Sequence, residues 1–280
     1  MKSPDRPHLG LTMNARPPSA FLTLLVALAL AGCAGLHRDD PATVAHWSLR
    51  DTRDVTIARG AIQSETGCGL DTIRFQPRHR RTRGAVILAP GFLRDQRSLT
   101  GLAVALAGQG IPVVTLTFCN SRPWDGRPVR NALDMIAVGR QLEATGVVYA
   151  GFSAGGLAAL IAGRLDPQAV GIVTLDLVDA HRLGVGMARA LNRPLVGLAG
   201  EPAACNAYNN GLKVFTVAPR ARITPIQGAS HCDFESPTDW LCESVCAGVD
   251  DGSPARRRTI IAAAMTAVAD LIGPANHARR

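Results

Sequence analysis

Lysine and aromatic residues are both scarce in this sequence. Lys2 and Lys213 are the only lysines, so the formal net charge of +8 comes almost entirely from arginine, and aromatic residues make up 4% of the chain. Nucleic-acid recognition would require a basic helix or a basic stripe interleaved with aromatic side chains, and neither is present. The densest basic cluster, residues 78–83, precedes an apolar segment and is explained as a solvated connection. We therefore expect no nucleic-acid partner.

The apolar stretch near the start of the chain is too short to span a bilayer comfortably. It covers residues 20–31, follows the positive charges of Lys2, Arg6 and Arg16, and ends at small residues before Cys33. A positive leader, a short apolar core and small residues in this order are typical of a cleaved export signal. An ordinary signal peptide cut nearby, with Cys33 incidental, is one interpretation of this pattern.

The other interpretation is a lipid anchor. The sequence Leu-Ala-Gly-Cys at residues 30–33 resembles the lipobox of bacterial lipoproteins, which implies cleavage before Cys33 and lipidation of that residue. By the same resemblance, Ala34 in place of aspartate implies an outer-membrane or periplasm-facing anchor in the bacterial cell envelope. We therefore predict four parts of the chain. They are a signal peptide at 1–32, a lipidated cysteine and tether at 33–50, one globular domain at 51–273 and a tail at 274–280.

The remaining cysteines contain no CxxC pair. They are Cys68, Cys119, Cys205, Cys232, Cys242 and Cys246. An even number in an exported protein favours disulfides, although the sequence leaves their connectivity open. Zinc is the competing interpretation because His231 lies near three of these cysteines. The adjacent side chains of His231 and Cys232 would point apart in an extended chain, so we expect no metal.

Strand-like and helix-like segments alternate through the predicted domain. Continuous apolar runs, as in buried strands, cover residues 86–89, 113–118, 147–150, 170–175, 195–199 and 222–226. Helical composition or spacing covers residues 99–107, 129–144, 157–165 and 259–272. This alternation predicts an α/β fold with a mostly parallel sheet and helices on both faces. Residues 55–58 and 73–75 should add antiparallel strands. Only one helix fits between Leu175 and Leu195, which leaves no room for a large cap domain.

A G-x-S-x-G motif at residues 151–155 lies directly between the predicted strand at 147–150 and the predicted helix at 157–165. The motif alone is a weak signal, but this setting is that of a nucleophile elbow. The serine there sits in a strained turn, and its glycine neighbours let strand and helix approach closely. We therefore predict that Ser153 is a catalytic nucleophile. A passive serine in a glycine-rich turn is the alternative.

A serine hydroxyl needs a base to remove its proton. His231 fits, because it follows the predicted strand at 222–226, where this base lies in elbow-type hydrolases. His181, between two strands, and His277, in the predicted tail, are weaker candidates. A disulfide at the neighbouring Cys232 would pin the loop that carries His231.

Three carboxylates compete to orient the imidazole of that base. Asp176 directly follows the predicted strand at 170–175, and Asp179 lies three residues further on. Glu201 follows the strand at 195–199, which is the commoner location of this acid among α/β-hydrolases. These positions alone do not decide between the three.

Two amide donors should stabilise the oxyanion of a tetrahedral intermediate. Ala154 immediately follows the nucleophile, and Phe92 follows the flexible Gly91 after the first buried strand, so we predict their N–H groups as the donors. The alternative is that Pro90 and Gly91 form only a turn. Trp124 either lines an acyl-binding groove or is a partly buried loop aromatic.

These motifs resemble the α/β-hydrolase superfamily over nearly all of residues 55–272, and most of all the chlorophyllases, bacterial polyester hydrolases and platelet-activating-factor acetylhydrolases. The proline-glycine-phenylalanine segment at 90–92 is similar to the oxyanion loop of the polyester hydrolases. Residues 175–179 resemble the chlorophyllase segment that contains the catalytic aspartate, with Leu177 in place of the usual proline. The resemblance implies Asp176 as the acid. Glu201 is the alternative, at a position where the polyester hydrolases have an aspartate.

The sequence therefore predicts a serine hydrolase that cleaves carboxylic esters through an acyl-enzyme, with Ser153, His231 and Asp176 as its triad. The predicted mechanism needs no metal or organic cofactor. The expected partners are a small or lipid-like acyl ester and, through the anchor, the membrane. A catalytically silent envelope protein that keeps the fold for binding, or an acyltransferase, is the alternative function.

Overall fold

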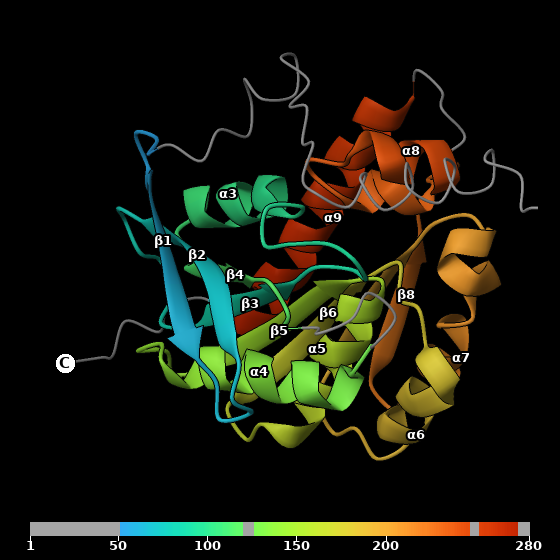
Figure 1. Cartoon of the computed structure of the whole chain (residues 1–280), viewed down its shortest axis with the longest axis horizontal. Helices are drawn as coiled ribbons and strands as arrows, with labels where there is room; N and C mark the ends of the chain where they lie inside the picture. Colours follow the sequence, from blue (N-terminus) through green and yellow to red (C-terminus); the bar gives the residue numbers. More distant parts are fainter. Residues whose placement is uncertain (1–50, 120–125, 247–251, 274–280) are drawn as a thin grey trace, which may run out of the picture. The chain divides into compact units, whose positions relative to one another are not determined.

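An eight-stranded sheet lies at the centre of the described chain (Figure 1). The computed structural model describes residues 51–119, 126–246 and 252–273, all within one compact unit. The strands are β1 Val55–Gln63, β2 Gly69–Pro77, β3 Ala85–Ala89, β4 Val113–Leu116, β5 Val147–Phe152, β6 Ala169–Leu175, β7 Leu195–Ala199 and β8 Ala221–Pro225. Their order is β1-β2-β4-β3-β5-β6-β7-β8. The β1–β2 and β2–β4 pairs are antiparallel and the others are parallel, which confirms the predicted sheet.

Helices cover both faces of this sheet (Figure 1). On one face lie α3 Thr100–Gly108 and α9 Ser253–Ile272; on the other lie α4 Pro128–Arg140, α5 Ala154–Leu165, α6 Leu183–Ala188 and α7 Leu212–Val217. Successive side chains of β3 alternate between the two cores: Val86 and Leu88 point to one, Ile87 and Ala89 to the other. A strand buried on both faces must be apolar throughout, which explains the continuous apolar runs.

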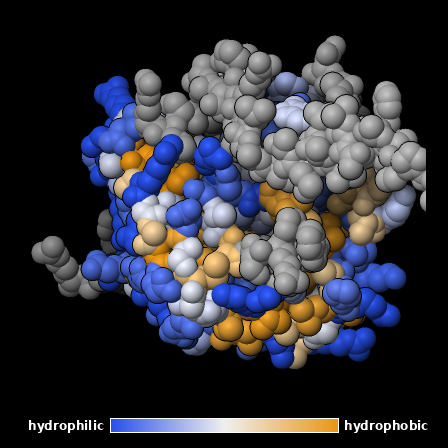
Figure 2. All heavy atoms as spheres, in the orientation of Figure 1, coloured by the Kyte–Doolittle hydropathy of each residue, from blue (hydrophilic) through white to orange (hydrophobic). Residues whose placement is uncertain are grey.

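The buried face of α4 is partly polar. Asp134 is fully buried and accepts hydrogen bonds from the hydroxyl groups of Ser64 and Thr66, each at 2.6 Å, whereas the next-door Leu133 is 44% exposed. Figure 2 also shows hydrophobic residues at the surface below the middle of the view, in the region of α4 and α6. The sequence predicted that this helix would extend to residue 144, but it ends at Arg140.

Several short elements were not predicted. They are the 3-10 helices η1 Ala180–Arg182, η2 Ala204–Asn209 and η3 His231–Phe234, together with α7 and α8 Trp240–Cys246. Between β6 and β7 the chain forms only η1 and α6, so no large cap domain is inserted there, as predicted. Within the described ranges, no helix has both the length and the apolar character needed to cross a membrane.

Some predicted features lie outside the described residues. They are the signal peptide at 1–32, the tether at 33–50 with Cys33, the tail at 274–280 with His277, and Trp124.

Candidate active site

Ser153 lies in a strained turn between β5 and α5. Its φ of 54° and ψ of −120° are costly for a residue that carries a side chain. A Cβ on Gly151 would lie 2.3 Å from the carbonyl oxygen of Gly155, and a Cβ on Gly155 would lie 2.2 Å from that of Pro90. Both approaches are far closer than any side chain permits. The glycine spacing of the motif is therefore a steric requirement of this turn.

His231 reaches this serine from the segment that follows β8. Its Nε2 lies 3.1 Å from Oγ of Ser153, within hydrogen-bonding distance, although 78 residues separate the two in sequence. Its ring packs against the ring of Phe152, with 4.6 Å between the ring centres. Ser153 and His231 are each only 6% exposed. The structure therefore brings the predicted nucleophile and base together in a largely buried pair.

Asp176 completes the line of contacts. It directly follows β6, and its Oδ2 lies 2.5 Å from Nδ1 of His231. The carboxylate is 1% exposed and also accepts hydrogen bonds from the Gly200 amide (2.9 Å) and from Nδ2 of Asn206 (3.1 Å). A carboxylate at Nδ1 makes that nitrogen the proton donor, which leaves Nε2 free to accept a proton from the serine hydroxyl.

The other predicted acids lie elsewhere. Glu201 is exposed, and its Oε1 accepts a hydrogen bond from the Gly228 amide at 2.9 Å. Asp179 accepts hydrogen bonds from the amides of Gly184 (2.6 Å) and Val185 (3.1 Å) at the start of α6. Asp176 is thus the one of the three that contacts the imidazole.

His181 does not join this group. It is exposed on η1, where its backbone adopts a left-handed conformation with φ 54°. Asn206, which no sequence pattern singled out, does join it, because η2 places its amide between Asp176 and the carbonyl oxygen of Glu201.

The predicted oxyanion donors lie on two segments that meet at Ser153. Residues 90–94, named here the oxyanion segment, pass beside the nucleophile: a Cβ on Gly91 would lie 3.4 Å from Cβ of Ser153. The Arg94 amide donates to the Gly91 carbonyl oxygen (3.2 Å) and closes a turn around Phe92. In the described ranges, neither the Phe92 nor the Ala154 amide donates a hydrogen bond to a protein oxygen. Both remain available to a ligand.

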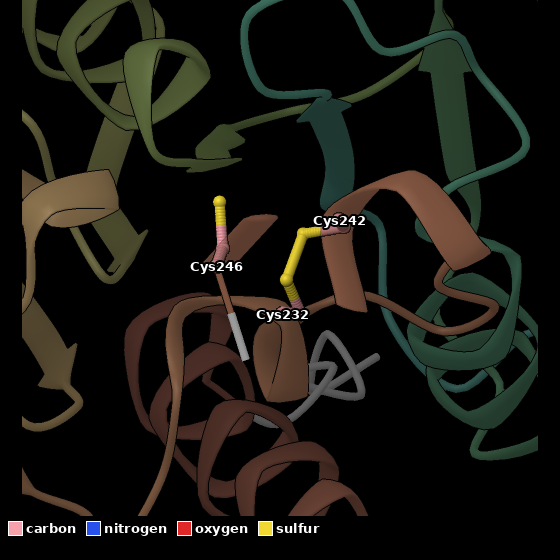
Figure 3. Close-up of side chains that lie close together, drawn as sticks. All are labelled: Cys232, Cys242 and Cys246. Atoms are coloured by element: carbon pink, nitrogen blue, oxygen red, sulfur yellow. A yellow bond between two sulfur atoms is a disulfide. The ribbon is translucent and has the colours of Figure 1, made fainter. Parts of the chain in front are cut away.

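Three disulfides cross-link the described residues. They are Cys68–Cys119, Cys205–Cys246 and Cys232–Cys242. Figure 3 shows the bond between Cys232 and Cys242 with Cys246 beside it, and the three sulfur atoms lie within 4.8 Å of one another. Metal binding would require thiolates, which sulfur atoms in disulfides do not offer. The imidazole of His231 contacts Ser153 and Asp176, so it is not available to these sulfurs as a fourth ligand.

Two carboxylates, Asp233 and Glu235, follow His231 in the segment 228–239, named here the histidine segment. Asp233 accepts hydrogen bonds from Nε of Arg256 (2.8 Å) and from the Ser253 hydroxyl, both on α9. Glu235 is 1% exposed, and its Oε1 lies 2.9 Å from Nε of Arg94. Each carboxylate therefore links the histidine segment to a different part of the fold.

Burial raises the pKa of Glu235 to about 7, because the charged form loses its hydration. The nearby charge of Asp239 raises that pKa further, whereas Arg94, the Thr238 hydroxyl and Arg257 lower it. The desolvation dominates, so the carboxyl group of Glu235 changes its charge close to neutral pH.

A surface hollow of about 380 Å³ lies between the β1–β2 pair and the chain that follows the oxyanion segment. Asp71, Asp95, Arg59 and Arg97 are among its lining residues, but Ser153 is not. The hollow is therefore separate from the Ser153–His231 pair.

Comparison with known proteins supports the fold. No protein-family model and no curated protein sequence matches the chain. Among solved structures, the chain is similar to the esterase domain of a Rhodothermus marinus protein, with 16% identity and a TM-score of 0.55 over 75% of this chain and 98% of that one. It is also similar to a hypothetical protein from Pseudomonas aeruginosa, with 15% identity and a TM-score of 0.53 over 68% and 90%. Together with the strand order, these likenesses show an α/β-hydrolase fold.

Proposed function

We propose that this protein is a serine hydrolase that cleaves carboxylic esters. The observation that carries the proposal is the continuous line of contacts from Oγ of Ser153 through His231 to the buried Asp176. A nucleophile, a base and an orienting acid in this order are what activation of a serine requires. The likeness to an esterase domain agrees with this reaction class.

The first half of the reaction acylates the serine. Oγ of Ser153 attacks the carbonyl carbon of the ester while its proton moves to Nε2 of His231. The carbonyl oxygen takes the negative charge and accepts hydrogen bonds from the Phe92 and Ala154 amides. When the intermediate collapses, the bond to the alcohol oxygen breaks and His231 returns the proton to the departing alcohol.

The second half releases the acid. Water loses a proton to Nε2 of His231 and attacks the acyl-serine, and the second tetrahedral intermediate expels Oγ of Ser153, which takes the proton back. The carboxylate of Asp176 stabilises the imidazolium in both halves and keeps the ring oriented. Its bonds from Gly200 and Asn206 hold it in place for this role.

We further place the chain nearest to the group of chlorophyllases, polyester hydrolases and platelet-activating-factor acetylhydrolases, with an uncharged, lipid-like acyl ester as its substrate class. The proline-glycine-phenylalanine sequence at 90–92 and the position of Asp176 directly after β6 support this placement. A series of p-nitrophenyl esters of increasing acyl length tests it, because a lipid-like preference requires kcat/KM to rise with chain length.

Turnover by the Ser153→Ala variant tests the hydrolase proposal. We expect loss of at least about 10³-fold in kcat, because the remaining groups cannot supply a nucleophile. Ser244→Ala is the matched control, since Ser244 is exposed on α8 and donates only to the Trp240 carbonyl oxygen. Turnover of Ser153→Ala equal to that of the control would overturn the proposal, and product analysis with added alcohols separates hydrolysis from acyl transfer.

We also propose that the protein is exported and lipidated at Cys33. Three disulfides in the described residues are in keeping with an oxidising compartment. Incorporation of labelled fatty acid into the full chain, and its loss in Cys33→Ser, is the expected result. Equal labelling of both chains, or none of either, would contradict lipidation at this residue.

A further inference from the structure

Arg94 connects the two segments that carry the oxyanion donor and the base. It ends the oxyanion segment, two residues after Phe92, yet its side chain reaches the histidine segment. Its Nε lies 2.9 Å from Oε1 of Glu235, and its Nη1 lies 2.8 Å from Oδ2 of Asp239. Its guanidinium thus spans two carboxylates that follow His231 in sequence.

The turn that Arg94 closes is strained. Leu93 has φ 59°, in the left-handed region that costs a residue with a side chain about 1 kcal/mol or more, and its own side chain is 62% exposed. Leu93 therefore gains little from packing. The backbone bond from Arg94 to Gly91 and the ion pairs of the Arg94 side chain therefore stabilise this turn, which contains Phe92 and passes beside Ser153 at Gly91.

The contact between Arg94 and Glu235 depends on charge more than on hydrogen-bond geometry. Among the described residues, Oε1 of Glu235 has no aligned hydrogen-bond donor despite its 2.9 Å distance from Nε of Arg94. The groups that face this carboxyl are Arg94, Asp239, Arg257 and the Thr238 hydroxyl, 3.3 Å away. Protonation of Glu235 would remove the attraction without creating a replacement.

We propose that Arg94 is a positioning residue that clamps the oxyanion segment to the histidine segment, and that the ionised carboxylate of Glu235 is needed for the full clamp. The inference rests on the proposed hydrolase function. It makes the geometry of the oxyanion hole responsive to pH: with Glu235 ionised, both carboxylates hold Arg94, and with Glu235 protonated only Asp239 does. The pKa of about 7 places this change near neutrality.

The test compares kcat of wild type and Glu235→Gln from pH 5.5 to 8.5 with an uncharged p-nitrophenyl ester. Effects of pH that do not pass through residue 235 act on both chains and cancel in the ratio of their kcat values. At pH 8 we expect the variant to lose about tenfold in kcat with little change in KM, since the donor is displaced and not removed, whereas outright loss of a donor costs about 10²–10³. At pH 5.5 the ratio should approach one.

Arg94→Gln tests the same clamp from its other end. It should lose more than Glu235→Gln at pH 8, because both ion pairs disappear, and the double variant should be no worse than Arg94→Gln alone. Arg94→Lys should recover only part of the activity, since an ammonium lacks the planar fork that reaches both carboxylates. If Glu235→Gln does not fold, the ratio of wild type to Arg94→Gln must still fall as the pH falls.

Two controls make the result specific. Arg222→Gln removes an exposed ion pair with Asp270 that is not part of the clamp, and it should match wild type at every pH. Fluorophosphonate labelling of wild type tests the underlying function. A chain that neither labels nor hydrolyses esters overturns both proposals. If the wild type is active but the ratio of its kcat to that of Glu235→Gln or Arg94→Gln does not change with pH, only the clamp proposal is overturned.

Discussion

Ser153 and His231, the proposed nucleophile and base, are held in place by different means. Ser153 is fixed by backbone sterics: Gly151 lies against the backbone of Gly155, Gly155 lies against the carbonyl oxygen of Pro90, and neither glycine leaves room for a side chain. The segment that carries His231 is fixed by links to three parts of the fold: a disulfide from Cys232 to α8, an ion pair from Asp233 to α9 and the pair between Glu235 and Arg94. Steric fixation tolerates almost no substitution, whereas a set of separate links should fail gradually. This difference can be measured.

Asp176→Asn should produce the largest loss that leaves the fold intact. An amide at this position can donate to Nδ1 and so favours the wrong tautomer of His231, which should reduce kcat by about 10³–10⁴. Glu201→Gln is the matched control, because the Glu201 side chain accepts a bond from the Gly228 amide and does not contact His231, and a glutamine oxygen can accept the same bond. Steady-state kinetics of the two variants at pH 8 give the answer. Equal losses would contradict the assignment of Asp176 as the acid.

Gly155→Ala should reduce kcat by about 10² or more, because its new methyl group must displace the Pro90 carbonyl oxygen and with it the oxyanion segment. Gly186→Ala on α6 is the control, since a Cβ there meets nothing within 4 Å. Activity should be measured on folded fractions with matching circular dichroism spectra. Full activity in Gly155→Ala would show that the turn is not sterically fixed.

Removal of one link to the histidine segment should have a smaller effect. Replacing Cys232 and Cys242 together by alanine should lower the free energy of unfolding by about 2–4 kcal/mol and kcat by about tenfold. The Cys68–Cys119 disulfide closes a larger loop than the Cys232–Cys242 disulfide, with a sequence separation of 51 against 10, so its removal should cost at least as much stability but less turnover. Urea denaturation gives the loss of stability of the two double variants, and steady-state kinetics give their loss of kcat. Equal losses of kcat would refute a specific role for the link beside His231.

Glu235→Gln should have a stability effect of opposite sign to its effect on activity. The pKa of Glu235 is raised from 4.5 to about 7, so the folded state holds this proton more tightly than the unfolded state. Its contribution to stability is therefore present at low pH and is lost as the pH rises from 4.5 through 7. Gln does not titrate, so the variant should gain on the order of 3 kcal/mol relative to wild type between pH 4.5 and 8. Urea denaturation of both chains at the two pH values measures this gain. The same difference in free energy of unfolding between variant and wild type at pH 4.5 and at pH 8 would contradict the raised pKa.

The features that sequence could predict are those with local causes. The order of strands and helices follows from apolar runs, and the turn at Ser153 follows from a glycine spacing that its sterics demand. The positions of Asp176 and Glu201 alone could not decide between them, because both follow a parallel strand. The family resemblance favoured Asp176, and the structure places the carboxylate of Asp176 at Nδ1 of His231. Asn206, Arg94 and the disulfide pairing could not be predicted. Each depends on segments that only the folded chain brings together, such as η2 beside β6 or the oxyanion segment beside residue 235.

Mass-spectrometric localisation of a fluorophosphonate adduct tests the proposed nucleophile most directly. If His231 activates Ser153, the intact wild-type chain should gain a single adduct, the labelled peptide should contain Ser153, and His231→Ala should label at least about 10²-fold more slowly. An adduct on another residue, or no adduct on folded protein under conditions that label a known serine esterase, would contradict this function.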